Sequence, residues 1–105
     1  MKYQVQYSQS AIRDLDRVWN EVFEASKDYG ITQKYLDELI DKVEAKVDYP
    51  KSGAPLYYED SFTGYYYVCF KTYLAFYRIE GDKMLVDRVL FAASDYLRHF
   101  HLGTD

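Results

Sequence analysis

The side chains best suited to chemistry stand in the C-terminal part of the sequence. Cations could stabilise the extra charge of a phosphate under attack, and a histidine or tyrosine could transfer the protons. The cations among the tyrosine-rich segments and their neighbours are Lys71, Arg78 and Arg88. His99 and His101 near the C-terminus are further candidates for proton transfer. These residue types indicate either a phosphate-binding surface or an ordinary strand surface with solvated charges.

Arg78 and Arg88 are predicted to lie on otherwise apolar strand faces. The apolar neighbours at two-residue spacing are Leu74 and Phe76 for Arg78, and Met84, Val86 and Leu90 for Arg88. An arginine on such a face either extends its charge to solvent at the rim or is partly buried and paired with a carboxylate. The sequence leaves both arrangements open.

No motif indicates a metal, a cofactor or a nucleophile. His99 and His101 would point about 200° apart on a helix, and no carboxylate or cysteine stands at a matching ligand spacing. The sequence has no Walker loop, no G-x-G-x-x-G, no G-x-S-x-G and no H-E-x-x-H. The single cysteine, Cys69, excludes an internal disulfide and is predicted to be a small buried hydrophobic residue within a strand. We therefore expect neither a metal nor a cofactor.

Length and charge limit the class of protein. The 105 residues suffice for one domain, residues 1–105, with a single core. No apolar run reaches the roughly 18–20 residues of a membrane span, and the N-terminus lacks the apolar segment of a secretory signal, so we expect a cytoplasmic protein. Thirteen Lys and Arg against seventeen Asp and Glu give a net charge of −4, which disfavours a whole-surface nucleic-acid binder.

Tyrosine is unusually frequent and unevenly placed. Thirteen of the aromatic residues are tyrosines, and seven of these lie between Tyr57 and Tyr77. The same region lacks acidic residues from 61 to 79. Tyrosine favours strands and interfaces because it combines packing area with a polar tip. The pattern predicts a sheet with a half-exposed face, with a surface that stacks bases or binds phosphate as the alternative.

The N-terminal segment predicts a strand and a helix. Residues 2–7 alternate polar and apolar side chains, as a half-buried strand does. Ser8 is a predicted N-cap. Apolar side chains recur at three- and four-residue spacing over residues 11–23, while charged side chains, Asp14 among them, are assigned to the opposite, solvated face. An amphipathic helix of about five turns is therefore expected.

A second helix is predicted directly after the first. Residues 28–30 are expected to end the first helix, with Gly30 in the left-handed conformation. Thr32 is the predicted N-cap of the second helix. Pro50 disfavours helical backbone at Tyr49 and is expected to stop it there. The two helices would form an antiparallel hairpin.

The second half of the chain predicts a loop and a strand meander. Proline, glycine and acidic residues over 50–64 indicate the loop. Three strands are then expected at residues 65–70, 73–79 and 84–91. Residues 94–102 have apolar side chains at helical spacing and are compatible with a short helix.

These elements predict an α+β two-layer sandwich with the order β-α-α-β-β-β, and a short C-terminal helix as an option. The helical pair would bury its apolar side chains against one face of an antiparallel-rich sheet, and the first strand would pair with one of the last three. The face of the sheet away from the helices, rather than the acidic helical surface, is then the surface expected to function.

Several segments, in this order, resemble the RelE/ParE superfamily, the toxins of type II toxin–antitoxin modules. The matching segments are YQVQYS at 3–8, AIRDL at 11–15, YPKSG at 49–53, YLAFYRIEGDK at 73–83, and RVL with the later SD within 88–95. They resemble the first strand and helix start, the exit from the second helix, the central hairpin, and the final strand with its exit. The resemblance spans nearly the whole chain.

The resemblance implies a small toxin that a cognate antitoxin neutralises, with the C-terminal segment of the antitoxin wrapped around it. ParE-like members poison DNA gyrase, whereas RelE-like members cleave mRNA on the ribosome. If the ribonuclease alternative holds, the implied catalytic residues are Arg78, Arg88, Tyr96 and His99. The residues expected to contact a partner are Lys71, Tyr73, Tyr77, Arg78, Arg98 and Phe100.

Three departures from the RelE-like pattern favour the ParE-like branch. Tyr67 and Cys69 stand where RelE-like ribonucleases carry lysines, Leu74 stands where they carry arginine, and Ser94 where they carry a basic residue. Cleavage of RNA needs cations around the phosphate, and the net charge of −4 weakens binding to the ribosome. A RelE-like ribonuclease and a non-toxic binding module on the same fold remain the alternatives.

Overall fold

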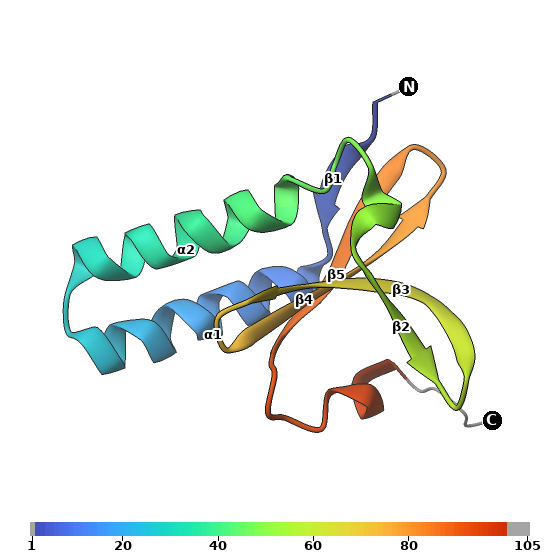
Figure 1. The fold of residues 1–105 in the computed structure, drawn as a ribbon. Helices are drawn as coiled ribbons and strands as arrows, with labels where there is room; N and C mark the ends of the chain where they lie inside the picture. Colours follow the sequence, from blue (N-terminus) through green and yellow to red (C-terminus); the bar gives the residue numbers. More distant parts are fainter. Residues whose placement is uncertain (1, 101–105) are drawn as a thin grey trace.

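Two helices lie across one face of a five-stranded sheet in the computed structural model, which describes residues 2–100 (Figure 1). The elements in chain order are β1 (Gln4–Tyr7), α1 (Gln9–Ser26), α2 (Tyr29–Glu44), the 3-10 turn η1 (Pro50–Ser52), β2 (Ala54–Tyr58), β3 (Ser61–Phe70), β4 (Tyr73–Glu80), β5 (Lys83–Phe91) and the 3-10 turn η2 (Tyr96–Phe100). The predicted α+β two-layer sandwich is confirmed. No helix within residues 2–100 is long and apolar enough to cross a membrane.

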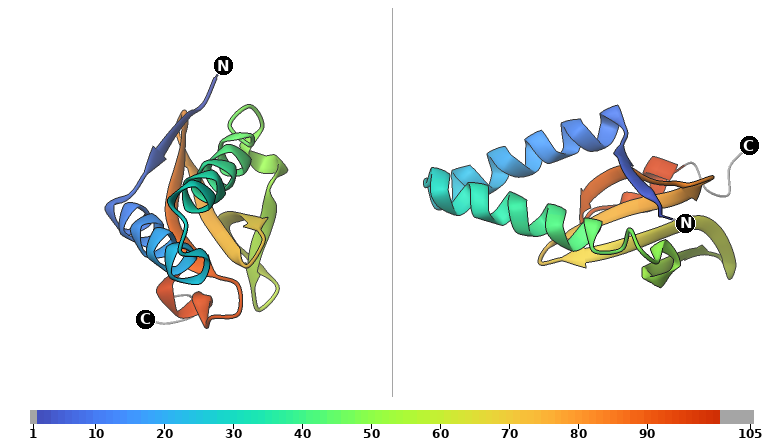
Figure 2. Two further views of the ribbon diagram at one scale, coloured as in Figure 1. Left: turned by 90° about the vertical axis from the view of Figure 1, so that its left-hand side faces the viewer. Right: turned by 90° about the horizontal axis from the view of Figure 1, so that it is seen from above.

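The strands follow the spatial order β1-β5-β4-β3-β2. The predicted pairing of the first strand with one of the last three is confirmed, because β1 runs parallel to β5 with Val5 opposite Met84. All the other neighbouring strands are antiparallel. The helices run side by side, and their joined ends project past the strands (Figures 1 and 2).

The prediction of a loop over residues 50–64 is wrong, because most of this segment forms η1, β2 and the start of β3. Glu59 and Asp60 adopt positive φ angles of 50° and 68° and make a tight two-residue turn between the strands. Pro55 is tolerated because β2 is an edge strand, where a missing N–H costs little. The proline and acidic residues that indicated a loop therefore belong to an edge hairpin.

The junction between the helices lies earlier than predicted. Ser8 caps α1 as expected, since its Oγ accepts from the Ala11 N–H at 3.0 Å. Lys27, rather than Gly30, takes the left-handed conformation, with φ 55°. Asp28 caps α2 in place of Thr32, because its Oδ1 accepts from the Ile31 N–H at 2.9 Å. Both carboxylate and hydroxyl groups make good N-caps, so spacing alone did not separate them.

Other boundaries also differ from the prediction. Thr32 is fully buried, and its Oγ1 donates to the Asp28 carbonyl at 2.8 Å. The regular helix α2 ends at Glu44, five residues before Tyr49, and the chain reaches Pro50 through turns. The C-terminal helix expected over 94–102 is observed as η2 over Tyr96–Phe100, and His101 lies outside the described residues.

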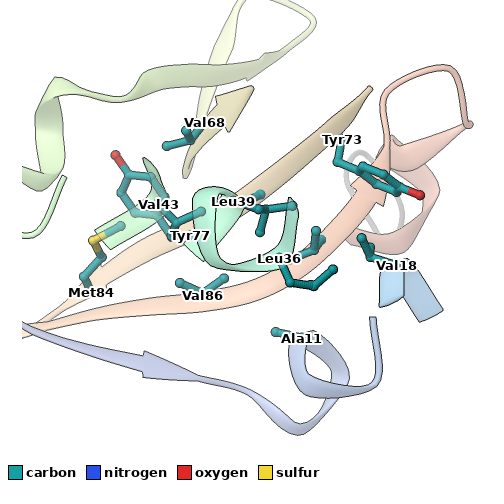
Figure 3. Close-up of a cluster of buried hydrophobic side chains, with 12 residues drawn as sticks. Ala11, Val18, Leu36, Leu39, Val43, Val68, Tyr73, Tyr77, Met84 and Val86 are labelled. Atoms are coloured by element: carbon teal, nitrogen blue, oxygen red, sulfur yellow. The ribbon is translucent and has the colours of Figure 1, made fainter. Parts of the chain in front are cut away.

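The main core fills the space between the helices and the sheet, as Figure 3 shows for most of its members. Tyr77 of β4 is its largest fully buried side chain, and its hydroxyl donates to the Pro50 carbonyl. Burial raises the pKa of Tyr77 to about 12. Gly53 packs directly on that ring: a Cβ at Gly53 would lie 2.0 Å from the Tyr77 hydroxyl oxygen. This contact fixes the start of β2 to the core.

A second apolar cluster lies on the other face of the sheet. Its buried members are Leu56, Leu74, Phe76 and Leu90. The turn η2 covers them with Tyr96, Leu97 and Phe100, so the face expected to be open is partly covered by the C-terminal segment. The Phe100 ring lies 4.9 Å from the ring of Phe76, measured between centroids.

The prediction that Arg78 shares a face with Leu74 and Phe76 is confirmed, because Arg78 stands opposite Tyr65, which packs on the second cluster. The prediction for Arg88 is wrong in part. A register shift between β4 and β5 inserts Asp87, so Arg88 stands opposite Phe76 instead of joining Met84 and Val86. Leu90 does belong to the second cluster.

Candidate functional site

A buried carboxylate connects α1 to the edge of β5. Asp14 is 3% exposed. Its Oδ2 accepts from Arg88 Nε at 2.7 Å and from the Val89 N–H at 2.9 Å. Its Oδ1 accepts from Arg88 Nη2 at 3.1 Å and from Arg17 Nη1 at 2.8 Å. Burial alone would raise the pKa of Asp14, but these hydrogen bonds outweigh it and hold the pKa below its ordinary value.

The prediction that Asp14 lies on the solvated face of the helix is wrong, because its side chain is buried. A signal for its burial was nevertheless present. Asp14 stands three residues after Ala11 and four residues before Val18, and both of these are fully buried. Residues at this spacing share one face of a helix, so Asp14 had to point at the sheet.

The hydrogen bonds around Asp14 form where β1 is too short to pair with the rest of β5. Pairing of β1 with β5 ends at Tyr7 and Val86. Beyond that point side chains take over: Ser8 Oγ donates to the Asp87 carbonyl at 2.8 Å, and Arg17 Nη2 donates to the Val89 carbonyl at 2.8 Å. The first turns of α1 therefore satisfy backbone groups that would otherwise be left unpaired at a buried edge.

Arg78 is also paired within the chain. Its Nε donates to Asp87 Oδ2 at 2.9 Å, and its Nη1 donates to Glu80. Burial and the neighbouring Asp87 carboxylate raise the pKa of Tyr65, whose ring lies in the same region. Both predicted arginines thus adopt the second of the two arrangements considered from the sequence, partly buried and paired with a carboxylate.

His99 of η2 completes a hollow of about 360 Å³. The residues that line it are Ser8, Ser10, Tyr65, Asp87, Arg88, His99 and Phe100. Arg88 Nη1 lies 3.1 Å from His99 Nδ1, and because arginine only donates, this ring nitrogen accepts. Burial, then the positive charges of Arg88 and Arg98, lower the pKa of His99. The ring is thereby kept neutral and in one tautomer.

The positive and negative charges around this hollow largely cancel. Arg17 and Arg88 share Asp14, while Arg78 contacts Asp87 and Glu80. A phosphate entering the hollow would have to compete with carboxylates that already hold the guanidinium groups. The arrangement is therefore suited to holding α1, β5 and η2 together, and poorly suited to concentrating positive charge on a phosphate.

Comparison with known proteins decides the family. A family model described as the ParE toxin of the type II toxin–antitoxin system, parDE, matches residues 5–96. The chain belongs to the ParE toxin family. It is thus the toxin of a type II toxin–antitoxin system, on the fold that ParE and RelE toxins share. No curated protein matches its sequence.

The solved structures that share the fold of this ParE-family chain include two toxin–antitoxin systems. The chromosomal ParDE system from P. aeruginosa contains a chain of 15% sequence identity with a TM-score of 0.71, and the match covers 85% of this chain and 95% of that one. The RelBE2 toxin–antitoxin complex from Mycobacterium tuberculosis contains a chain of 21% identity with a TM-score of 0.60, covering 87% of this chain and 99% of that one.

The ParE-family fold brings some of the predicted site residues together. Arg88, His99 and Phe100 line one hollow, and Arg78 contacts the Asp87 carboxylate at its wall. Tyr96 packs on Phe76 with ring centroids 5.2 Å apart, in the second apolar cluster. Arg98 is exposed on η2.

Other predicted residues lie elsewhere. Tyr77 is fully buried and Tyr73 is 5% exposed, both between the sheet and the helices, so in this fold their side chains are not accessible to a partner. The Tyr73 hydroxyl donates to Glu21 of α1. Lys71 lies at the turn between β3 and β4, with its amine 5.2 Å from the centroid of the Tyr35 ring.

Cys69 is exposed, so the prediction that it is buried is wrong. It stands opposite Leu74 near the end of β3, beyond the area that η2 covers. Within residues 2–100, no group of three or more histidine, cysteine or acidic side chains is arranged to hold a metal ion.

Proposed function

We propose that this ParE-family toxin stops growth by protein–protein contact with a topoisomerase such as DNA gyrase, and that a cognate antitoxin neutralises it. The observation that carries the proposal is the internal pairing of its arginines. Arg78 and Arg88 are the cations that RNA cleavage would need, and both are held by carboxylates of the same chain. A toxin that works by contact has no need of free cations around a phosphate.

The overall charge supports the same conclusion. A net charge of −4 gives little attraction to the phosphate-rich surface of a ribosome. Exposed aromatic side chains, by contrast, are typical of protein interfaces. Tyr57 and Phe62 are about half exposed, at 56% and 47%, and Tyr49 is 79% exposed.

The antitoxin partner is supported by the family and by the assemblies of similar fold. The family model describes the toxin of a type II toxin–antitoxin system, parDE. The RelBE2 structure is a toxin–antitoxin complex. We also propose a cytoplasmic location, as expected from the sequence, because DNA gyrase and the ribosome are both cytoplasmic in bacteria.

One observation favours the ribonuclease as a second candidate. His99 is kept neutral beside Arg88 in an accessible hollow, and a neutral histidine near a cation could act as a base on a ribose hydroxyl. In that mechanism Arg78 or Arg88 would have to leave its carboxylate to bind the phosphate. Tyr65, which also lines the hollow, would lie close to the reacting groups.

Expression without the antitoxin separates the candidates. We expect the wild-type chain to arrest growth, to leave mRNA uncut, and to cause double-strand breaks at sites of gyrase action. The His99→Ala variant should arrest growth as well as the wild type does, because no proton transfer is involved. In-frame mRNA cuts that disappear in His99→Ala would overturn the proposal in favour of the ribonuclease. Unimpaired growth with folded protein would indicate a non-toxic binding module.

A further inference from the structure

The two helices carry an apolar stripe beside the faces that they bury. Ile12, Trp19 and Phe23 recur at seven- and four-residue spacing, so they lie along one side of α1. Tyr29 of α2 extends the stripe, with its ring centroid 4.8 Å from that of Phe23 and 6.4 Å from that of Trp19. Ile12 is 51% exposed and Tyr29 is 72% exposed. These four side chains, the hairpin stripe, leave apolar area open on the helices.

The rings of the hairpin stripe are held in place by the fold. Trp19 also packs against the main core. Tyr29 begins α2 directly after the N-cap Asp28, so its backbone is fixed. The joined ends of the two helices project past the strands (Figures 1 and 2). Tryptophan and tyrosine contribute most to binding in protein interfaces, and rings that are already ordered lose little conformational freedom when a partner covers them.

Two carboxylates accompany the hairpin stripe. Asp16 stands three residues before Trp19, on the same side of α1. On α2, Gln33 follows Tyr29 by one turn, and its Nε2 donates to Asp37 Oδ1 at 2.9 Å. Both aspartates are exposed, and the ion pairs among residues 2–100 involve neither of them. Their charges are therefore available to a partner that covers the stripe.

The helical pair also holds the whole net charge of the chain. Residues 9–44 contain five Lys and Arg against nine Asp and Glu, a balance of −4 that equals the net charge of all 105 residues. The rest of the chain is balanced. Association is favoured when surfaces of opposite charge meet, so the helices select a basic partner.

The other apolar surfaces are less suited to such a partner. Tyr57 and Phe62 line a hollow of about 310 Å³ in which Lys51 is the charged residue, and its amine repels a basic surface. The face of the sheet away from the helices is partly covered by η2. The hairpin stripe is therefore the exposed aromatic surface whose surrounding charge attracts a basic partner.

Enzymes that bind double-stranded DNA neutralise its phosphates with lysine and arginine, so they carry extended basic surfaces. A topoisomerase is such an enzyme. We propose that the hairpin stripe docks on a basic surface of the topoisomerase, with Trp19 and Tyr29 in an apolar groove. Asp16 and Asp37 pair with lysine or arginine beside that groove. The inference rests on the proposed target and adds the surface of this chain that contacts it.

Binding of purified DNA gyrase to four variants of the full chain tests the proposal. Tyr29→Ser and Asp37→Lys should each raise the dissociation constant for gyrase about tenfold or more. The matched controls are Tyr57→Ser and Asp48→Lys, at exposed positions away from the hairpin stripe. The controls should bind gyrase about as tightly as the wild type. Equal binding by all four variants would overturn the proposal.

Ionic strength tests the match of charges. The affinity of the wild-type chain for gyrase should fall as the salt concentration rises, because salt screens exposed charges. Asp16→Lys should weaken this dependence on salt. Asp48→Lys makes the same change in net charge and should leave the dependence as it is in the wild type. A wild-type affinity that does not change with salt would overturn docking on a basic surface.

The outcomes separate the docking surface from the target. If the wild-type chain neither binds gyrase nor stabilises its cleaved DNA, the proposed target is wrong. If the wild type does both and Tyr29→Ser and Asp37→Lys do so equally well, the target stands and the docking surface is wrong. A variant of the hairpin stripe that still poisons gyrase but no longer binds the antitoxin would assign the stripe to the antitoxin and overturn the proposal.

Discussion

Asp14 of α1 and Arg88 of β5 form a two-point ion pair, with Nε–Oδ2 and Nη2–Oδ1 distances of 2.7 and 3.1 Å, although 74 residues separate them in the sequence. The pair does two things at once. It holds the first helix at the edge of β5, and it occupies a cation that a ribonuclease would need for phosphate. The stability of the fold and the proposed lack of RNA cleavage would therefore depend on the same contact.

Replacing Asp14 by alanine should destabilise the fold strongly. The change leaves Arg88 and the Val89 N–H without their buried acceptor, and loss of one member of a buried ion pair costs about 3–5 kcal/mol. Urea unfolding followed by circular dichroism would measure the free energy of unfolding. The control is Asp16→Ala, on the exposed side of the same helix, which should change it by less than about 0.5 kcal/mol. Similar values for the two variants would contradict the role assigned to Asp14.

The same carboxylate should make stability fall in acid. The pKa of Asp14 in the folded state lies below its ordinary value of 3.8, so the unfolded chain binds a proton more readily than the native one. Its contribution is complete well above pH 3.8 and is lost as the pH falls through the folded pKa. Urea midpoints measured from neutral pH downwards should drop less steeply for Asp14→Asn. If the urea midpoints of the variant and the wild type fall in parallel with pH, groups other than Asp14 cause the loss of stability in acid.

Gly53 should tolerate no side chain while Tyr77 keeps its position. A Cβ at Gly53 would lie 2.0 Å from the hydroxyl oxygen and 2.9 Å from Cζ of the Tyr77 ring. Since that ring is fully buried, we expect Gly53→Ala to cost about 1–3 kcal/mol through overpacking. Thermal or urea unfolding would measure this cost.

A double-mutant comparison tests the cause of that cost. In the Tyr77→Phe background the hydroxyl is absent, so Gly53→Ala should cost less there than in the wild type. An equal cost in both backgrounds would mean that the loss arises elsewhere than at the contact between Gly53 and Tyr77.

Periodicity predicted the elements that have a clear pattern. Alternation identified β1, runs of apolar and aromatic residues identified β4 and β5, and the three- and four-residue spacing identified both helices. β2 was missed because Pro55 and the acidic turn at residues 59–60 look like a loop when the edge position of the strand is unknown. The junction between the helices at residues 27–32 was predicted too late in the chain, because several residues there could serve as caps. Only tertiary packing chooses among them.

The candidate site was harder to predict than the fold. The sequence named Arg78, Arg88 and His99, and raised pairing with a carboxylate as one of two arrangements. It did not identify Asp14, whose charge was read as solvated although its spacing from Ala11 and Val18 indicates burial. The register shift at Asp87 has no local signal, and it is what moves Arg88 away from the face of Met84 and Val86.

A DNA cleavage reaction with purified gyrase tests the central claim most directly. The purified chain is added to gyrase, supercoiled plasmid and ATP, and the reaction is stopped with detergent and protease. We predict that linear plasmid accumulates with the wild-type chain and with His99→Ala alike, and that prior addition of the antitoxin prevents it. A reaction in which gyrase turns over normally and no linear DNA forms, while the same preparation cuts mRNA on ribosomes, would contradict the account.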